Sequence, residues 1–171
     1  MSYCRKNNWS SENEIRINKQ IGLELYASHA YNNLYSYFKS DAVGFNGIAE
    51  YFKKCSDEEI EHARKFMDYQ NIRGGRVELG MIESPLFEFN INSDKSILHQ
   101  ALYYALELEQ KVYSSILDIS KSSNDAGLED FLDDFIKEQL EAQYELGMRL
   151  KQLEIIGKDG HGIVDYDKNM F

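Results

Sequence analysis

The chain has 171 residues, 43% of them hydrophobic, and a formal net charge of −10 at pH 7. This length and composition suit a single domain, residues 1–171, with a sizeable core. The negative charge disfavours nucleic acid and anionic membranes as partners and favours cations. The sequence has no run of 18 apolar residues that would predict a membrane span.

The scarcity of helix-breaking residues predicts a mostly helical protein: Pro85 is the one proline, and glycines are sparse inside the periodic stretches. The two cysteines, Cys4 and Cys55, suggest a reducing compartment rather than a disulfide framework. The opening residues lack an apolar or Arg-rich presequence. We therefore expect a cytoplasmic location, or an organellar one if a presequence has been removed.

Ser11 and Glu14 have capping-box spacing and predict the start of a first long helix, after a flexible arm over residues 1–9. This helix ends before a short connection over 40–47, so the next helix should return antiparallel to it. One acid interrupts its apolar stripe, which contains Ile17, Ile21, Glu24, Ser28, Tyr31, Tyr35 and Phe38.

The second predicted helix covers about 45–73 and ends at the glycines of Arg73-Gly74-Gly75. An acid and a histidine, Glu59 and His62, interrupt its stripe of Ile48, Phe52, Cys55, Phe66 and Tyr69. Ser56 and Glu59 also match a capping box, but the periodicity continues through them, so we discount that match. Residues at i and i+3 lie on one helix face, so Glu59 and His62 are close enough to bind one ion together.

No helical pattern resumes until about residue 93. The second helix would be about 42 Å long, and the roughly 18 residues that follow span at most about 60 Å. The connection can therefore cross the bundle, and the third helix, about 93–121, should run parallel to the second. Its stripe contains Leu98, Leu102, Ala105, Glu109, Val112, Ile116 and Ile119.

The fourth predicted helix follows a turn over 122–127 and ends at Gly157. Its stripe contains Leu128, Leu132, Phe135, Gln139, Ala142, Leu146 and Leu153, with Gln139 and Ala142 at the interrupting positions. Residues 163–171 are long enough for a short final helix. The fold class is thus all-α: a four-helix bundle with one long crossover between its second and third helices.

A single inward acid is better explained by a Lys or Arg partner, or by a solvent-accessible bundle end, than by metal binding. Here an acid or an amide interrupts the stripe of every long helix, and bundling brings the helix centres together. Carboxylates with an imidazole suit iron, manganese or zinc. In di-iron bundles, each of two helices carries one Glu, and each of the other two carries a Glu-x-x-His motif. Since the fourth helix offers Gln139 and Ala142 instead, we expect one firmly held metal position and one weakly held.

Several segments resemble the motifs of the ferritin family in order: residues 23–28 (LELYAS) with Tyr31, 58–63 (EEIEHA), 70–76 (QNIRGGR), 108–109 (LE) and 138–139 (EQ). The resemblance spans about residues 10–155; its first half is similar to eukaryotic heavy-type subunits, and its second half to bacterial ferritins. It implies a homo-oligomeric shell of about 24 subunits. In such a shell, Fe(II) is oxidised by dioxygen within each subunit and Fe(III) is stored as mineral.

The same resemblance implies roles for particular residues. The ferroxidase ligands would be Glu24, Glu59, His62, Glu109 and Gln139. Tyr31 would be their hydrogen-bonding or redox partner, although an aromatic core residue is an equal explanation. Ile60 stands where haem-binding relatives carry Met, so no haem is expected.

Three further groups of acids have weaker assignments. Glu58, Glu138 and Glu141 resemble part of a third iron site, but Ala142 stands where many bacterial ferritins have an acid. Glu58 and Glu61 would face the cavity and nucleate mineral, or form a solvated charged surface. Asp130 and Asp133 would line the three-fold channels, or be surface acids near a helix start.

Two other functions remain open. One is a di-iron oxidase or peroxidase that keeps its metals; the missing second Glu-x-x-His and the lack of a Cys-x-x-Cys appendage disfavour it. The other is a metal-free helical bundle that serves as an interaction module. A shell, a dimer and a monomer differ strongly in particle mass, so sizing the native particle separates these possibilities.

Overall fold

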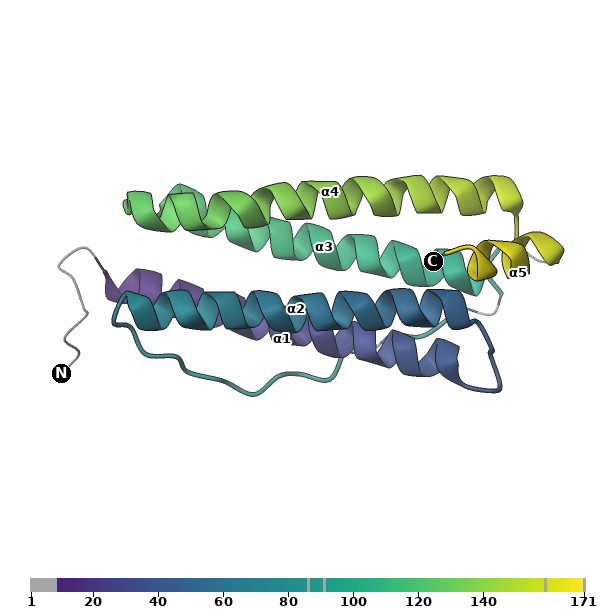
Figure 1. Cartoon of the computed structure of the whole chain (residues 1–171), viewed down its shortest axis with the longest axis horizontal. Helices are drawn as coiled ribbons and strands as arrows, with labels where there is room; N and C mark the ends of the chain where they lie inside the picture. Colours follow the sequence, from purple (N-terminus) through teal and green to yellow (C-terminus); the bar gives the residue numbers. More distant parts are fainter. Residues whose placement is uncertain (1–8, 86, 91, 159, 171) are drawn as a thin grey trace.

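The computed structural model describes residues 9–85, 87–90, 92–158 and 160–170. This part of the chain forms five helices: α1 (Ser11–Lys39), α2 (Asn46–Ile72), α3 (Ile97–Ser122), α4 (Ala126–Ile156) and α5 (His161–Lys168). The first four form an elongated bundle, and a long segment between α2 and α3 runs along its side (Figure 1). The predicted all-α bundle with a single crossover and a short final helix is confirmed.

The helix starts differ from the predictions by a few residues. The side chain of Ser10, rather than that of Ser11, caps α1 by accepting a hydrogen bond from Asn13 N. The third helix begins at Ile97 rather than near 93, because Ser96 is the residue whose hydroxyl accepts from His99 N. Ser93 instead accepts a local bond from Lys95 N, which competes with helix formation.

The predicted N-terminal arm falls mainly on residues 1–8, including Cys4, which lie outside the described residues. Trp9, its last residue, is buried. Its ring lies over the guanidinium of Arg73, 4.5 Å from the ring centroid, and edge-on to Tyr69. Trp9 is therefore part of the packed bundle end.

Two small residues let α1 and α2 pack closely. Ser28 and Ser56 are both buried, and their hydroxyls lie 2.9 Å apart. The Ser56 hydroxyl also donates to the backbone carbonyl of Ser28. Ser56 thus lies inside α2, as predicted, and does not cap a helix. Its hydroxyl bonds to the neighbouring helix instead.

Polar contacts fix both ends of the bundle. At one end Arg73 forms two hydrogen bonds to Asp125, whose carboxylate also caps α4 by accepting from Leu128 N. At the other end Asp167 of α5 accepts from Ile48 N near the start of α2, whose N-cap residue, Phe45, makes no side-chain cap bond. These contacts set the register of the helices whose centres carry the site.

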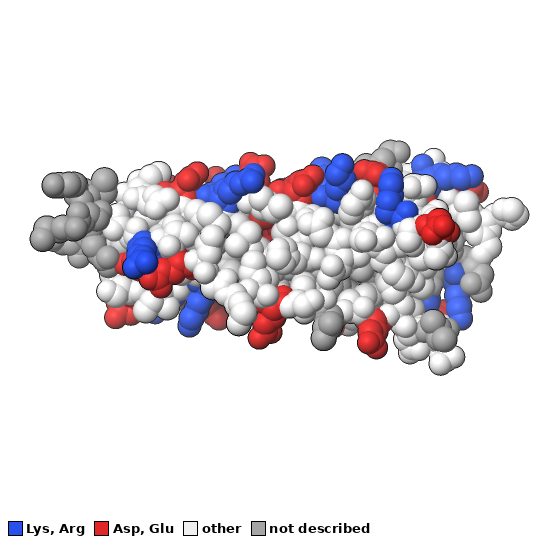
Figure 2. Space-filling model, turned by 90° about the horizontal axis from the view of Figure 1, so that it is seen from below, with Lys and Arg blue, Asp and Glu red and all other residues white. Residues whose placement is uncertain are grey.

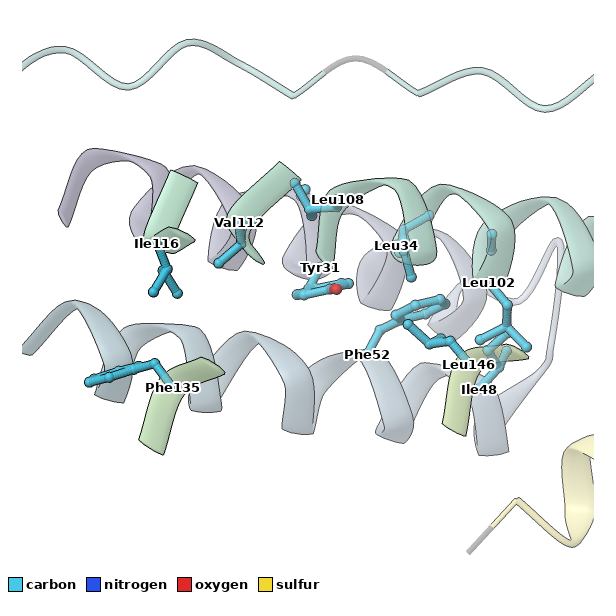
Figure 3. Packing of buried hydrophobic residues seen from close by; sticks show 14 of the residues in the cluster. Tyr31, Leu34, Ile48, Phe52, Leu102, Leu108, Val112, Ile116, Phe135 and Leu146 are labelled. Carbon is cyan, nitrogen blue, oxygen red and sulfur yellow. The ribbon is translucent and has the colours of Figure 1, made fainter. Parts of the chain in front are cut away.

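The apolar core fills the bundle on both sides of its middle. In the close-up, Tyr31 lies between Val112, Ile116 and Phe135 on one side and Leu34, Phe52, Leu102, Ile48 and Leu146 on the other (Figure 3). Burial of these side chains supplies the main driving force for packing. Among the described residues, no helix combines the length and apolar character needed to cross a membrane.

Candidate metal centre

The four long helices bring the predicted ligands to the middle of the bundle. Glu24 lies on α1, Glu59 and His62 on α2, Glu109 on α3 and Gln139 on α4. The three acids and Gln139 are buried, and His62 is half-buried. Each replaces an apolar residue in its helix's inward stripe, so the same periodicity that builds the core directs these side chains into it.

Three of these side chains converge tightly. One ligand atom each from Glu24, Glu59 and His62 lies within 4.8 Å of the other two. Within this group, His62 Nδ1 is 3.5 Å from Glu59 Oε2. Two carboxylates and an imidazole at this spacing can coordinate a single divalent ion.

Several oxygens at the centre have no hydrogen-bond partner. These buried atoms are Glu24 Oε2, Glu59 Oε2, Glu109 Oε2 and Gln139 Oε1. The salt bridges that Lys and Arg make in the described part of the chain involve other acids. Unpaired buried oxygens are costly in a folded protein, and a bound cation would satisfy them. The donor set therefore fits a divalent metal.

The acids also hold protons unusually strongly. Burial, followed by the charge of Glu59, raises the pKa of Glu24 well above its ordinary value. Burial and the charge of Glu109 raise the pKa of Glu59 to about 8. Burial likewise raises the pKa of Glu109. Carboxyls that would otherwise stay protonated give up their protons when a cation takes the protons' place.

The remaining predicted ligands form a less complete second position. Glu109 Oε1 accepts a short hydrogen bond from the Tyr31 hydroxyl, so one of its oxygens is already engaged. Gln139 provides a neutral oxygen, and Ala142, which also borders the site, has no donor atom. The second position thus has fewer free anionic oxygens than the first, and the expected difference in metal affinity stays a prediction.

A cavity of about 600 Å³ opens beside the centre, between α2 and α4. Glu59, His62, Glu109 and Gln139 border it, so the centre is connected to the surface of the isolated subunit. An ion that leaves the centre can enter this cavity without crossing the apolar core.

Comparison with known proteins agrees with these features. A family model described as a ferritin-like domain matches residues 16–156. The chain belongs to the ferritin family. It is 40% identical over 164 residues to Ferritin-1, chloroplastic, of Brassica napus, with coverage of 94% of this chain and 64% of that protein.

Two other ferritins show similar agreement. Identity is 42% over 159 residues with Ferritin-2, chloroplastic, of Zea mays, covering 91% of this chain and 63% of the relative. It is 41% over 158 residues with Ferritin-4, chloroplastic, of Arabidopsis thaliana, covering 90% and 60%. The chain thus spans less than two thirds of the length of these relatives.

In this ferritin the outer acids lie around the cavity and are exposed. Glu58 and Glu61 on α2 face the cavity, as do Glu138 and Glu141 on α4. Glu58 pairs with Lys54 at 3.3 Å, and Glu61 with Lys65 at 3.8 Å, one helical turn away. Each of the two acids predicted to nucleate mineral therefore has a lysine partner in the subunit, and their nucleation role stays a prediction.

The two acids assigned to the ferritin channel lie apart from the centre. Asp130 and Asp133 are exposed on the first turns of α4, near the bundle end that carries Asp125. Their channel role stays a proposal.

Gln20 is the main residue at the site that sequence reasoning missed. It is fully buried, and its Nε2 donates to Glu24 Oε1 at 2.7 Å. Its own oxygen accepts from the hydroxyl of Ser115 on α3 at 2.6 Å. Gln20 thus fixes one oxygen of Glu24 and leaves the other directed elsewhere. Its i, i+4 spacing from Glu24 was the available signal.

Proposed function

We propose that this ferritin oxidises Fe(II) with dioxygen at the centre of Glu24, Glu59 and His62, and stores Fe(III) as mineral inside a shell of identical subunits. Two Fe(II) ions give up one electron each, and one dioxygen molecule takes both electrons with two protons to become hydrogen peroxide. The observation that carries the proposal is the convergence of one imidazole and buried carboxylate oxygens that have no hydrogen-bond partner. In the described part of the chain, no Lys or Arg forms a salt bridge with these carboxylates.

The residues of the chain divide the work between two positions. Glu24, Glu59 and His62 would hold the first iron. Glu109, Gln139 and a shared Glu59 would hold the second, with Tyr31 fixing the orientation of Glu109 through its hydroxyl. Because the second position has few anionic oxygens, its iron would leave as product, and the adjoining cavity offers the way out.

The acids outside the centre would handle iron before and after oxidation. Asp130 and Asp133 would attract Fe(II) at the channels between subunits. Glu58 and Glu61 would nucleate mineral, and a third iron site at Glu58, Glu138 and Glu141 would be incomplete because Ala142 supplies no oxygen. No haem is expected in this proposal, since Ile60 has no ligand atom.

Exposed apolar surface supports assembly with other copies of the chain. Viewed from below, the subunit shows a long uncharged area with acidic and basic residues gathered mainly along its edges (Figure 2). On α1 and the start of the crossover, Ile15, Leu79 and Met81 are exposed and border one groove. Apolar surfaces of this kind mark contact sites. A homo-oligomer is therefore expected, and a shell of about 24 subunits is the form we propose.

Aerobic loading tests the proposal. Fe(II) is added in large excess over subunits in air, and the products are separated by size. We expect soluble iron to elute with protein at the mass of a shell. The Glu59→Ala variant should form the same particle but oxidise the first iron at least about tenfold more slowly, since it lacks the carboxylate shared by both positions. Precipitated iron with none in the high-mass fraction would refute storage.

The competing functions predict other outcomes. A di-iron oxidase or peroxidase would retain about two metals per subunit and store none. A metal-free module would bind no iron, but its core would still contain three acids that burial makes hard to ionise. A cation at the centre would offset this cost, which favours the metal-binding function over the metal-free module.

Location is part of the proposal. The names of the relatives place them in chloroplasts, so the cytoplasmic location expected from the sequence is not confirmed. An organellar location is the one that fits these relatives. Fractionation of cells that express the full-length gene product, with an antibody against this chain, distinguishes the two compartments.

A further inference from the structure

The imidazole of His62 contacts a carboxylate that is outside the group of converging ligands. His62 Nε2 lies 3.1 Å from Glu138 Oε2, which joins α2 to α4. The opposite ring nitrogen, Nδ1, is the one that lies 3.5 Å from Glu59 Oε2. The ring therefore bridges a carboxylate at the cavity and the centre of the bundle.

The chemistry of the ring assigns a role to each nitrogen. A neutral imidazole has one N–H donor and one lone pair. An ionised carboxylate only accepts, so the proton at this contact belongs to Nε2. Nδ1 then presents its lone pair toward Glu59, on the side of the converging ligands. A carboxylate that fixes the tautomer and orientation of a metal-binding histidine in this way typically strengthens metal binding.

A second residue of α4 restrains the same ring. The Phe135 ring meets the His62 ring edge to face, with centroids 5.5 Å apart and planes 73° apart. Glu138 and Phe135 are three residues apart and thus lie on one side of α4. The fourth helix lacks a histidine of its own, yet it contacts the histidine of α2 by one polar and one aromatic side chain.

We propose that Glu138 is a positioning residue of the first metal position, which it serves by holding His62 Nε2–H so that Nδ1 faces the metal. The inference rests on the proposed function and replaces the assignment of Glu138 to a third iron site. The third iron site has few available ligands, because Glu58 is paired with Lys54 and Ala142 has no donor atom. Glu138, by contrast, already has a partner in His62.

Cobalt(II) binding to the metal-stripped, assembled protein tests this role without iron oxidation. The affinity of the first Co(II) ion is measured by visible absorption in the parent, Glu138→Ala and Glu138→Gln. Glu138→Ala should lower this affinity by about 10-fold to 100-fold, the usual effect of losing such a partner. Glu138→Gln should stay close to the parent, because its amide oxygen still accepts the hydrogen bond from Nε2.

Two controls separate positioning from general charge effects. Glu145 lies two turns along the same face of α4, borders the same cavity and pairs with Arg149 rather than with a histidine. Glu145→Ala removes the same charge and should change the first affinity by no more than about twofold, as expected of a residue without shared partners. In a His62→Ala background, Glu138→Ala should produce no further loss.

The outcomes are distinct. Equal losses in Glu138→Ala and Glu145→Ala, or a loss that persists in the His62→Ala background, would overturn the positioning role. The positioning role would also be wrong if Glu138→Ala bound the first Co(II) as tightly as the parent while His62→Ala bound it more weakly. That result would leave the proposed metal centre intact. If His62→Ala binds the first Co(II) as tightly as the parent, both the inference and the proposed centre are wrong.

Discussion

Replacing Glu59 by a residue that cannot ionise should stabilise the metal-free protein at neutral pH. Glu59 is buried, and its pKa is raised from 4.5 to about 8. The folded protein keeps this proton over a pH range in which the unfolded chain releases it. The free energy of unfolding of the parent should therefore fall as the pH rises from about 4.5 to about 8, and level off outside that range.

The size of the effect follows from the difference between the two pKa values. Each pH unit above the ordinary pKa contributes about 1.4 kcal/mol, which gives about 3 kcal/mol at pH 7 and less than about 1 kcal/mol at pH 5. Glu59→Gln keeps the size of the side chain but cannot ionise. For a domain of this length, its melting temperature should exceed that of the parent by about 6–12 °C at pH 7 and by about 1–3 °C at pH 5.

Differential scanning calorimetry of the chelator-treated proteins measures this difference. Asp57→Asn is the matched control, since Asp57 lies on the same helix but is exposed; its melting temperature should follow the parent within about 2 °C at both pH values. Adding Zn(II) should narrow the gap, because the parent binds the ion more tightly than the variant. A gap of the same size at pH 5 and pH 7, or no gap at all, would refute the reasoning.

Three other variants give further tests. Gln139→Glu with Ala142→His should raise the iron retained per subunit after stoichiometric loading, oxidation and desalting, although overpacking at 142 can destabilise by about 1–3 kcal/mol; unchanged retention in the folded variant contradicts the weak second position. Asp130→Asn with Asp133→Asn should slow iron uptake at low Fe(II) and weaken its dependence on salt; equal rates and salt dependence would make these ordinary surface acids. Asp125→Asn should lower stability by about 1–3 kcal/mol at pH 7. Its arginine partner lowers the pKa of Asp125, so this difference should shrink below about pH 4, where the parent begins to lose the same charge; a constant difference in calorimetry would show that the charge is unimportant.

The bundle could be predicted because its signals are periodic and long. The stripe of α3, from Leu98 to Ile119, is buried at every position named from the sequence. The start of α3 was predicted about four residues too early, near Ser93, because only the fold decides that the Ser96 hydroxyl bonds to the helix while that of Ser93 bonds locally. The burial of Trp9 was also missed, because its partners Tyr69 and Arg73 are distant in the sequence.

The candidate centre was predictable to the level of residues but not of contacts. Polar residues that interrupt an apolar stripe stand out in a sequence, which is how Glu24 and Glu109 were found. The hydrogen bonds between Tyr31 and Glu109 and between His62 and Glu138 join residues that are 78 and 76 positions apart in the sequence. Such contacts depend on the rotation of each helix and on side-chain conformation, which periodicity alone does not determine.

The most direct test of the metal centre is to locate iron in the crystal. Crystals of the assembled protein would be soaked briefly in Fe(II), frozen, and measured on both sides of the iron absorption edge. We predict that the strongest anomalous peak in each subunit lies between Glu24, Glu59 and His62, with a weaker peak beside Glu109. Peaks confined to surface acids such as Asp130, with none inside the bundle, would contradict the account.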